Sequence, residues 1–586
     1  MLFELNSKLI GHYALGHITL VFAVCWTPWL LFFIEKIATQ NPKSKLIKIA
    51  PGLILGLIIL ADIRWSVYSG LLIGSYYFLQ RFKALSKIEN AYNIKSLGIE
   101  FLKNIRYLSL ILLSSLLLAS PLLIPFMEYM KLSTRSQLSS IDNLSFSFPP
   151  IQLINLIIPN FGGYAEWIIY PGIFSIIAII ILLTKKEARQ MTAYWIILIF
   201  ACLILSMGEY LPGVKQLFLM PGMDLLRVPS RFLLLNAISI PVLSAYAVDG
   251  VENLQLLNKE KSRTVFIIIA ITFFIIIFSL GYAWLSQTIS KNIVWSITTV
   301  IFIGGIWILY INGWIKQKMF IFVAILFLTI DLAGVNYFGI RYENSFEENN
   351  KYSEIIRIVE QNKNLFRVYS PSYSLPQHIG AYYAMELADG IDPLQLISYN
   401  NYMEKASGVP NDGYSVTIPA FNNGEPEVDN SQYTPNAELL GKLNVKYILS
   451  EFDLEIVGFK YIESYQGTRI YENLFYLPRA WIQETKQAAG MKKTSVPVIN
   501  ETCNGYYVEI EGEGHLVLSD IYFPGWNAYI GKEKLATEKM DIFLAIDLPD
   551  NTKRVEFVYQ PKSLEIGMVL FGFYILCTVV YSKFQL

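Results

Sequence analysis

This chain contains about eleven separate apolar stretches, each long enough to cross a lipid bilayer. They fill residues 15–338 and recur at 563–581, with a long polar segment between the last two. A hydrocarbon core of about 30 Å requires about 20 mainly apolar residues per helical crossing. Inside lipid the backbone must satisfy its own hydrogen bonds, which a helix does within one segment. The composition agrees, since 54% of the residues are hydrophobic and 16% are charged. We therefore expect a polytopic α-helical membrane bundle.

The polar segment carries a different pattern. Runs such as FRVYS, VKYILS, TRIYEN and GYYVEIEG alternate apolar and polar residues, which predicts short antiparallel strands and most simply a sandwich. The predicted fold is a bundle of about 11 membrane helices with a mainly-β, sandwich-like extracytoplasmic domain before the last helix. The predicted helices are 17–35, 49–61, 66–81, 106–127, 167–184, 191–206, 230–248, 264–285, 292–312, 319–338 and 563–581. The predicted domains are the bundle (1–338), an α+β region (339–500), a β subdomain (501–562) and the C-terminal helix (563–586).

The distribution of lysine and arginine predicts the orientation. The basic loops are 36–48, 81–106, 185–189, 259–263 and 316–318, and the loops between them carry fewer such residues. The positive-inside rule places the basic loops in the cytoplasm. Residues 340–562 then lie outside a cell (inner) membrane, and the C-terminus lies inside. The same rule places the N-terminus outside. Two explanations are open: the chain is a natural short form, or it lacks an upstream portion with an odd number of crossings.

Several classes of function lack support. Lysine plus arginine and aspartate plus glutamate balance at 47 each, and this balance does not indicate nucleic acid. No P-loop, GxGxxG, HExxH or GxSxG motif stands in a usable context, and no cysteine–histidine cluster indicates a metal site.

Arg227 and Arg231 are the strongest local signal, because they flank the predicted start of a membrane helix at Pro229. A helix N-terminus attracts anions, and guanidinium groups bind phosphate oxygens in a bidentate way. We predict that both hold a phosphate group. The alternative is that they contact lipid headgroups or pair with Asp224 and Glu209.

Two further groups are candidates for a cavity near the same side of the membrane. Asp62, Arg64 and Trp65 form a tight turn, in which Asp62 is either a weak candidate for a catalytic base or the partner in a local ion pair. His12 and His17 are five residues apart and would lie well off a common face of a regular helix. We expect them to line the mouth of the bundle, with interfacial polar residues as the alternative.

Several motifs together resemble a known family. They are GHYALGH, LADIRW, IIPNFGG, LRVPSRF, LLGKLNVKYIL, RIYENLFYLPRAW and LVLSDIYFPGWNAYIGKE. The chain resembles the YfhO-type family of bacterial membrane proteins, and also the membrane proteins called 6-pyruvoyl-tetrahydropterin synthase-related. Both groups are similar to the GT-C superfamily of integral membrane glycosyltransferases.

The resemblance implies an activity. GT-C enzymes transfer a sugar from a polyprenyl-phosphate carrier to a glycan or lipid acceptor on the outer face, so membrane lipids, the donor and the acceptor are the implied partners. Arg227 and Arg231 match the position where the carrier phosphate would be held. No cofactor is certain, although some members of the superfamily use a divalent metal.

The chain departs from the superfamily at the acidic residue of the first external loop, because Glu4 is the only carboxylate before His12. The alternative function is therefore a non-catalytic envelope scaffold or lipid-glycan binding protein. A transporter is a third option, but no paired broken helices support it.

Overall fold

The computed structural model describes most of the chain. The described ranges are 1–40, 42–86, 94–139, 141–160, 162–184, 186–220, 222–251, 258–287, 290–339, 345–359, 365–411, 413–421, 424–483, 495–496, 498–510 and 514–583. They form two compact units. The first contains residues 1–119, 139–342 and 573–586, and the second contains residues 120–138 and 343–572.

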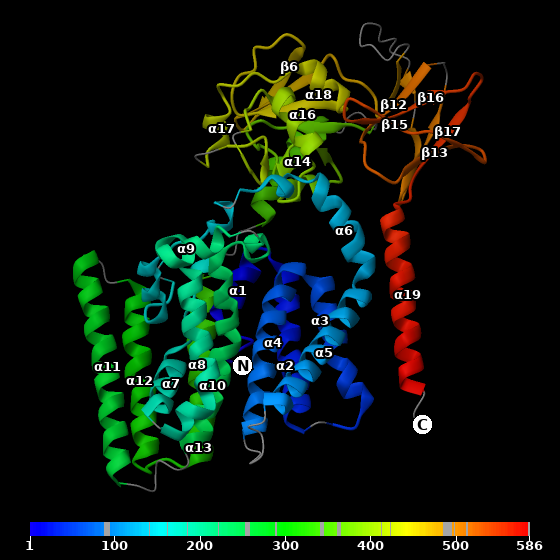
Figure 1. The fold of residues 1–586 in the computed structure, drawn as a ribbon. Helices are drawn as coiled ribbons and strands as arrows, with labels where there is room; N and C mark the ends of the chain where they lie inside the picture. The colour runs from blue at the N-terminus through cyan, green and yellow to red at the C-terminus, as the bar shows by residue number, and fades with distance from the viewer. Residues whose placement is uncertain are drawn as a thin grey trace. The chain divides into compact units, whose positions relative to one another are not determined.

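The first unit is a helical bundle whose long helices run beside one another (Figure 1). Its helices are α1 (Ser7–Ala14), α2 (Ile18–Gln40), α3 (Lys45–Ala61), α4 (Ile63–Ser86), α5 (Ile94–Leu118), α7 (Ile173–Thr184), α8 (Lys186–Ser206), α9 (Pro212–Phe218), α10 (Asn236–Val251), α11 (Asn258–Ser286), α12 (Lys291–Ile311) and α13 (Gln317–Gly339). Short 3₁₀ turns connect them, among them η2 (Asp142–Leu144), η3 (Pro150–Leu156), η4 (Ala165–Trp167), η5 (Gly208–Tyr210), η6 (Met223–Leu226) and η7 (Pro229–Leu235).

Seven helices in the described part of the chain are long and apolar enough to cross a membrane. They are Ile18–Gln40, Gly98–Leu118, Pro229–Asp249, Lys261–Ser286, Lys291–Ile311, Gln317–Tyr337 and Lys562–Tyr581. Helices also form at the other predicted positions, but α7 and the apolar part of α8 are shorter than a full crossing. The chain is therefore a membrane protein with multiple apolar helices, and the number eleven stays a prediction.

Two helix boundaries differ from the expected ones. The predicted helix 106–127 is interrupted at Ala119, between α5 and α6 (Ser120–Leu132), two residues before Pro121. Proline removes a backbone donor and clashes with the preceding turn, which explains the break. The predicted helix 167–184 begins only at Ile173, because the chain before it forms the turn η4.

A buried carboxylate ties several helices together. Asp331 in α13 is 2% exposed, and it accepts hydrogen bonds from the Tyr170 hydroxyl at 2.9 Å, the Trp295 indole at 3.0 Å and the Ile173 N–H at 3.2 Å. Such pairing is what a carboxylate inside a membrane bundle requires.

The second unit begins with α6 and contains a mixed α/β region. Its helices are α14 (Ser345–Val359), α15 (Gln377–Tyr382), α16 (Ile397–Ser407), α17 (Pro426–Asp429) and α18 (Ala437–Lys442). One sheet has the order β2–β1–β5–β7–β6, with strands β1 (Arg367–Tyr369), β2 (Glu386–Leu387), β5 (Val445–Ser450), β6 (Phe459–Tyr465) and β7 (Thr468–Asn473). Strand β1 pairs in parallel with both β2 and β5. The expectation of purely antiparallel strands was wrong here, because helices in the connections allow parallel crossovers.

The predicted sandwich is present. One sheet has the order β10–β11–β17–β13–β14 and the other β15–β16–β12–β8–β9. The strands are β8 (Ala480–Gln483), β9 (Ser495–Val496), β10 (Val498–Thr502), β11 (Gly505–Glu509), β12 (Gly514–Ile521), β13 (Trp526–Ile530), β14 (Glu533–Leu535), β15 (Glu538–Met540), β16 (Phe543–Leu548) and β17 (Arg554–Tyr559). A two-stranded ladder joins β3 (Gly390–Ile391) and β4 (Thr417–Ile418), and helix α19 (Lys562–Lys583) ends the described chain.

The second sheet of the sandwich is buried on both faces. Leu516 and Leu518 of β12 pack into the core between the two sheets, while Val517 packs into the core of the α/β region. Alternate residues of a strand point to opposite faces, so one strand serves both cores. The sandwich includes β8, which lies before residue 501, and the predicted domain boundaries stay predictions.

Candidate functional site

The two N-terminal histidines lie together at one end of the bundle. Helix α1 ends at Ala14, and Gly16 turns the chain with a φ of 76°. The His17 N–H then donates to the carbonyl of His12 at 3.0 Å, and their Nδ1 atoms are also 3.0 Å apart. The two residues converge because the helix stops between them, which the regular-helix assumption did not foresee.

Glu166 is the centre of a charged cluster, whose other members are Lys8, His12, His17, Asp62, Arg64 and Arg231. It lies in the turn η4 with 1% exposure. Its Oε1 accepts a hydrogen bond from Arg231 at 3.0 Å and lies 3.7 Å from Nδ1 of His17, while its Oε2 accepts from the Ser230 hydroxyl at 3.3 Å. Helix α1 approaches this turn closely, since a Cβ added to Gly11 would lie 3.0 Å from the carbonyl oxygen of Ala165.

Lys8 adds a buried cation to the same place. Its side chain is 2% exposed, and its ammonium donates to the carbonyl oxygen of Glu166. Arg231 and Lys8 therefore approach Glu166 from two different elements, the start of η7 and the first turn of α1.

Asp62 and Arg64 form the local ion pair that was one of the two interpretations of the sequence. Asp62 caps α4 by accepting the N–H of Arg64 at 2.9 Å and of Trp65 at 3.3 Å, and it also binds the Arg64 guanidinium. Trp65 is fully buried and donates its indole N–H to Thr27 at 2.8 Å. Both Asp62 and Arg64 lie close enough to act electrostatically on His17.

Arg227 has a different environment from Arg231. Its Nε donates to the carbonyl oxygen of Asp142 at 3.2 Å. Arg231 instead pairs with Glu166, a partner that the sequence interpretation did not name. The role of Arg227 in phosphate binding stays a prediction.

Burial and charge together set the protonation of the cluster. Burial lowers the pKa of His12 well below its usual value, and nearby Lys8 and Arg231 add to that effect. Burial likewise lowers the pKa of His17, with Glu166 and Asp62 opposing the shift and Arg231 and Arg64 adding to it. Both imidazoles are therefore neutral at pH 7.

The buried lysine and glutamate respond differently. Burial lowers the pKa of Lys8 to about 7, with Glu166 opposing and Arg231 reinforcing this shift. Burial acts to raise the pKa of Glu166, but the charges of Arg231 and Lys8 outweigh it, and the pKa lies below its ordinary value. Glu166 is therefore a carboxylate at neutral pH.

Several polar atoms in or next to the cluster have no hydrogen-bond partner among the described residues. They are Nε2 of His12, Nε of Arg231, the hydroxyl of Tyr68 and the hydroxyl of Ser7. Leaving buried donors unpaired is costly. The side chains of His17 and Arg64 are 26% and 39% exposed, so the cluster is accessible from that side.

Three residues of the cluster place possible metal-ligand atoms close together. His12, His17 and Glu166 each place one ligand atom within 4.8 Å of the others. Imidazole and carboxylate suit several divalent metals. However, Lys8 and Arg231 contact the same glutamate, and their charges oppose a further cation. The three ligand atoms are close enough together to hold a metal ion, but the positive charges of Lys8 and Arg231 oppose one.

An apolar cavity of about 330 Å³ lies beside the cluster. Its walls come mainly from isoleucine and leucine side chains of α7, α8 and α10, and Asn6, Lys8 and Asn236 form its polar part. Lys8 is thus shared between the charged cluster and the apolar cavity.

The sequence interpretation selected six of the residues that lie in or next to this cluster, namely His12, His17, Asp62, Arg64, Trp65 and Arg231. It missed Lys8 and Glu166. A signal for Glu166 was present, since it is the only charged residue between Asp142 and Lys185. The signal is weak, however, because Glu166 lies in a loop, where a carboxylate is normally solvated.

Comparison with known proteins identifies the family. The model of the family described as bacterial membrane protein YfhO matches residues 67–502, which is more than half of the chain. Glu166, Arg227 and Arg231 lie inside the matched range, whereas Lys8, His12, His17, Asp62 and Arg64 precede it. No curated protein matches the chain. The chain belongs to the YfhO family of bacterial membrane proteins.

Proposed function

We propose that this chain is a GT-C-like membrane glycosyltransferase, which transfers a sugar from a polyprenyl-phosphate carrier to a cell-envelope acceptor on the outer face of the membrane. The single observation that carries the proposal is the buried cationic cluster around Glu166, next to an apolar cavity. A lipid-linked phosphate carries an anionic group, which the cations would bind, and a hydrocarbon chain, which the cavity would bind.

The charges of the cluster favour an anion. With Lys8 protonated, three cations (Lys8, Arg64, Arg231) face two carboxylates (Asp62, Glu166), which leaves one positive charge because the histidines are neutral. A phosphate group would neutralise this excess. It would also pair with the unsatisfied Nε of Arg231, because guanidinium donors suit phosphate oxygens.

The apolar cavity supports a lipid carrier over a free phosphate. Its walls offer mainly hydrocarbon side chains, and Lys8 is the charged residue among its three polar ones. A prenyl chain in this cavity would place its phosphate beside Lys8 and Arg231. Burial of each chain methylene contributes about 0.8 kcal/mol, so the cavity would add to the affinity that the charges provide.

Glu166 would orient Arg231 and Lys8 rather than accept a proton, since an ion-paired carboxylate is a weak base. Asp62 stays the weak candidate for the base that deprotonates an acceptor hydroxyl. It holds two backbone N–H groups and Arg64, which limits its basicity in the same way.

The pairing of both carboxylates with cations favours a binding protein as the alternative to an enzyme. A protein whose two carboxylates are both committed to cations could bind a lipid-linked glycan without transferring it. The second candidate function is therefore a non-catalytic envelope scaffold or lipid-glycan binding protein.

Transfer of a labelled sugar from polyprenyl phosphate, measured in proteoliposomes with mixed glycan acceptors, tests the proposal. We expect transfer by the natural chain, its loss in Arg231→Ala, and no change in Arg263→Ala, which removes an exposed arginine at the start of α11. Binding of the donor without any transfer would contradict the enzyme and support the binding protein. Absence of both would contradict both.

A further inference from the structure

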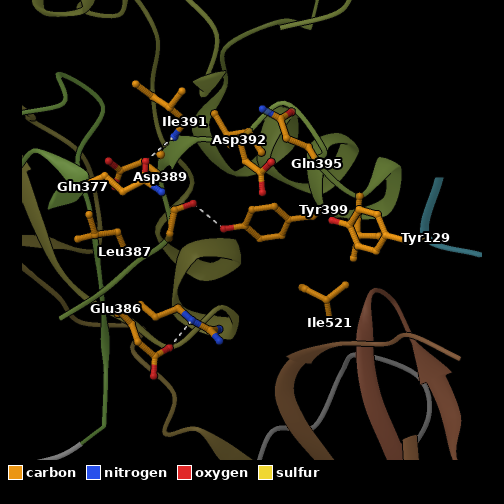
Figure 2. A pocket seen from close by; sticks show the side chains of 15 residues that line it. Tyr129, Gln377, Glu386, Leu387, Asp389, Ile391, Asp392, Gln395, Tyr399 and Ile521 are labelled. Carbon is orange, nitrogen blue, oxygen red and sulfur yellow. Dashed lines mark hydrogen bonds and ion pairs between the residues drawn. The ribbon is translucent and has the colours of Figure 1, made fainter. Parts of the chain in front are cut away.

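A second cavity, independent of the charged cluster, lies in the second unit. It has a volume of about 440 Å³ and is lined by the segment 386–392, the residues at the start of α16, and Tyr129 of α6 (Figure 2). Pockets of this size with a few placed polar groups are typical of small-molecule sites.

One wall of this cavity presents an amide whose orientation is fixed from behind. Gln395 is 4% exposed, and its Oε1 accepts a hydrogen bond from Nδ2 of Asn400 at 2.7 Å. The Oδ1 of Asn400 in turn accepts from Nδ2 of Asn411. With the three amides in this orientation, the Gln395 side chain presents its Nε2 away from Asn400.

The Nε2 of Gln395 is buried and has no hydrogen-bond partner among the described residues. The backbone holds it in place, since the carbonyl oxygen of Gln395 accepts the N–H of Thr134 at 2.8 Å. A buried amide without a partner is rare in a folded protein, and a donor at a cavity wall can bind an acceptor on a ligand.

Two tyrosine rings form another part of the wall. The hydroxyl of Tyr399 donates to the carbonyl oxygen of Ala388 at 2.5 Å, and that of Tyr129 donates to the carbonyl oxygen of Leu394. Both hydroxyls are therefore engaged with the backbone, and the rings remain as apolar surface for a flat partner. Figure 2 shows both rings among the side chains that line the cavity.

The carboxyl groups of the wall disfavour an anionic ligand. Three carboxyl groups (Glu386, Asp389, Asp392) line the cavity. Glu386 is bound by two guanidiniums, that of Arg367 at 3.0 Å and that of Arg479. Burial raises the pKa of Asp389 to about 7, so this group both donates and accepts hydrogen bonds near neutral pH. A ligand here must carry hydroxyl groups and an apolar face, and it must be neutral or cationic.

We propose that this cavity binds the ring of a neutral or amino sugar, with the Gln395 amide donating to a ring substituent and with Tyr129 and Tyr399 as the stacking surface. The site does not depend on the proposed transferase activity, because it lies within the second unit and shares no residue with the charged cluster.

Saturation-transfer NMR on the full chain in lipid nanodiscs tests the proposal. The probes are glucose, galactose, mannose, N-acetylglucosamine and glucosamine, each up to about 10 mM, a range that detects weak single-ring binding. Glucose 6-phosphate serves as the anionic comparison. We expect at least one uncharged or amino sugar to bind and glucose 6-phosphate not to bind.

Three variants decide the role of the amide. Gln395→Leu removes the donor and should weaken sugar binding at least about tenfold. Gln395→Glu keeps the acceptor for Asn400 and serves if the leucine variant fails to fold. The matched control, Gln432→Leu, makes the same change at an exposed glutamine outside the cavity and should leave binding unchanged.

Absence of binding by every sugar overturns the proposal, as does equal binding of glucose 6-phosphate or undiminished binding by a folded Gln395 variant. Donor binding at the charged cluster is measured separately with polyprenyl phosphate. Failure of one site is therefore distinguishable from failure of the other.

Discussion

Arg231 and Glu166 form a buried ion pair, with 3.0 Å between the guanidinium Nη2 and the carboxylate Oε1. The two residues are 65 positions apart in the sequence and come from different 3₁₀ turns, η7 and η4. The pair joins two loops that the lysine distribution places on the same side of the membrane. It also keeps Arg231 beside Lys8 and the histidines, where we propose that an anionic group binds.

Glu166→Gln is expected to destabilise the protein strongly. The substitution keeps the shape of the side chain but leaves Arg231 and Lys8 without a compensating charge, and breaking a buried ion pair in this way costs about 3–5 kcal/mol. Thermal unfolding in detergent measures the loss. The control Glu209→Gln changes an exposed carboxylate in the same unit and should shift stability by less than about 0.5 kcal/mol. Equal melting temperatures for the two variants would contradict the assigned role of Glu166.

Stability should rise with pH through the titration of Lys8. Burial lowers the pKa of Lys8 to about 7 in the folded protein, while an unfolded lysine titrates near about 10.4. Between these values the unfolded chain binds more protons, so raising the pH favours the folded state. We expect a steeper rise in melting temperature from about pH 7 to pH 10 in the natural chain than in Lys8→Met. The exposed Lys215 provides the control Lys215→Met, which should keep the natural slope. Identical slopes in all three proteins would be evidence against a buried, charge-destabilised Lys8.

Removal of divalent metal should not abolish binding of the anionic donor. His12, His17 and Glu166 have metal-ligand spacing, but Lys8 and Arg231 already supply positive charge at the same glutamate. We expect polyprenyl-phosphate binding to change by less than about twofold after treatment with a chelator. A loss that added Mn²⁺ or Mg²⁺ restores would instead assign a metal to the three residues.

Much of the fold could be predicted because membrane helices and alternating strands have strong sequence signals. The strand runs VKYILS and TRIYEN form β5 and β7 as expected. The parallel pairing of β1 was not predictable from alternation alone, since alternation fixes the exposed face of a strand and not its direction.

The site was predicted in part, and the reasons differ between residues. Arg231 was found because a guanidinium at a helix start is a recognisable anion-binding signal. The contact between His12 and His17 depends on where α1 ends, and the ends of helices are the least predictable part of a pattern. Glu166 lies in a loop, where a carboxylate is normally solvated, and only the fold shows that this one is buried.

Binding of polyprenyl phosphate to the purified full chain in nanodiscs tests the central claim most directly, with the uncharged polyprenol as the comparison. The account predicts that the natural chain binds the phosphate and not the alcohol. It also predicts that Arg231→Ala weakens phosphate binding by about 10- to 150-fold, since a hydrogen bond to a charged group contributes about 1.5–3 kcal/mol, and that Arg263→Ala has no effect. Equal binding of the alcohol, or undiminished phosphate binding by a folded Arg231→Ala protein, would contradict the account.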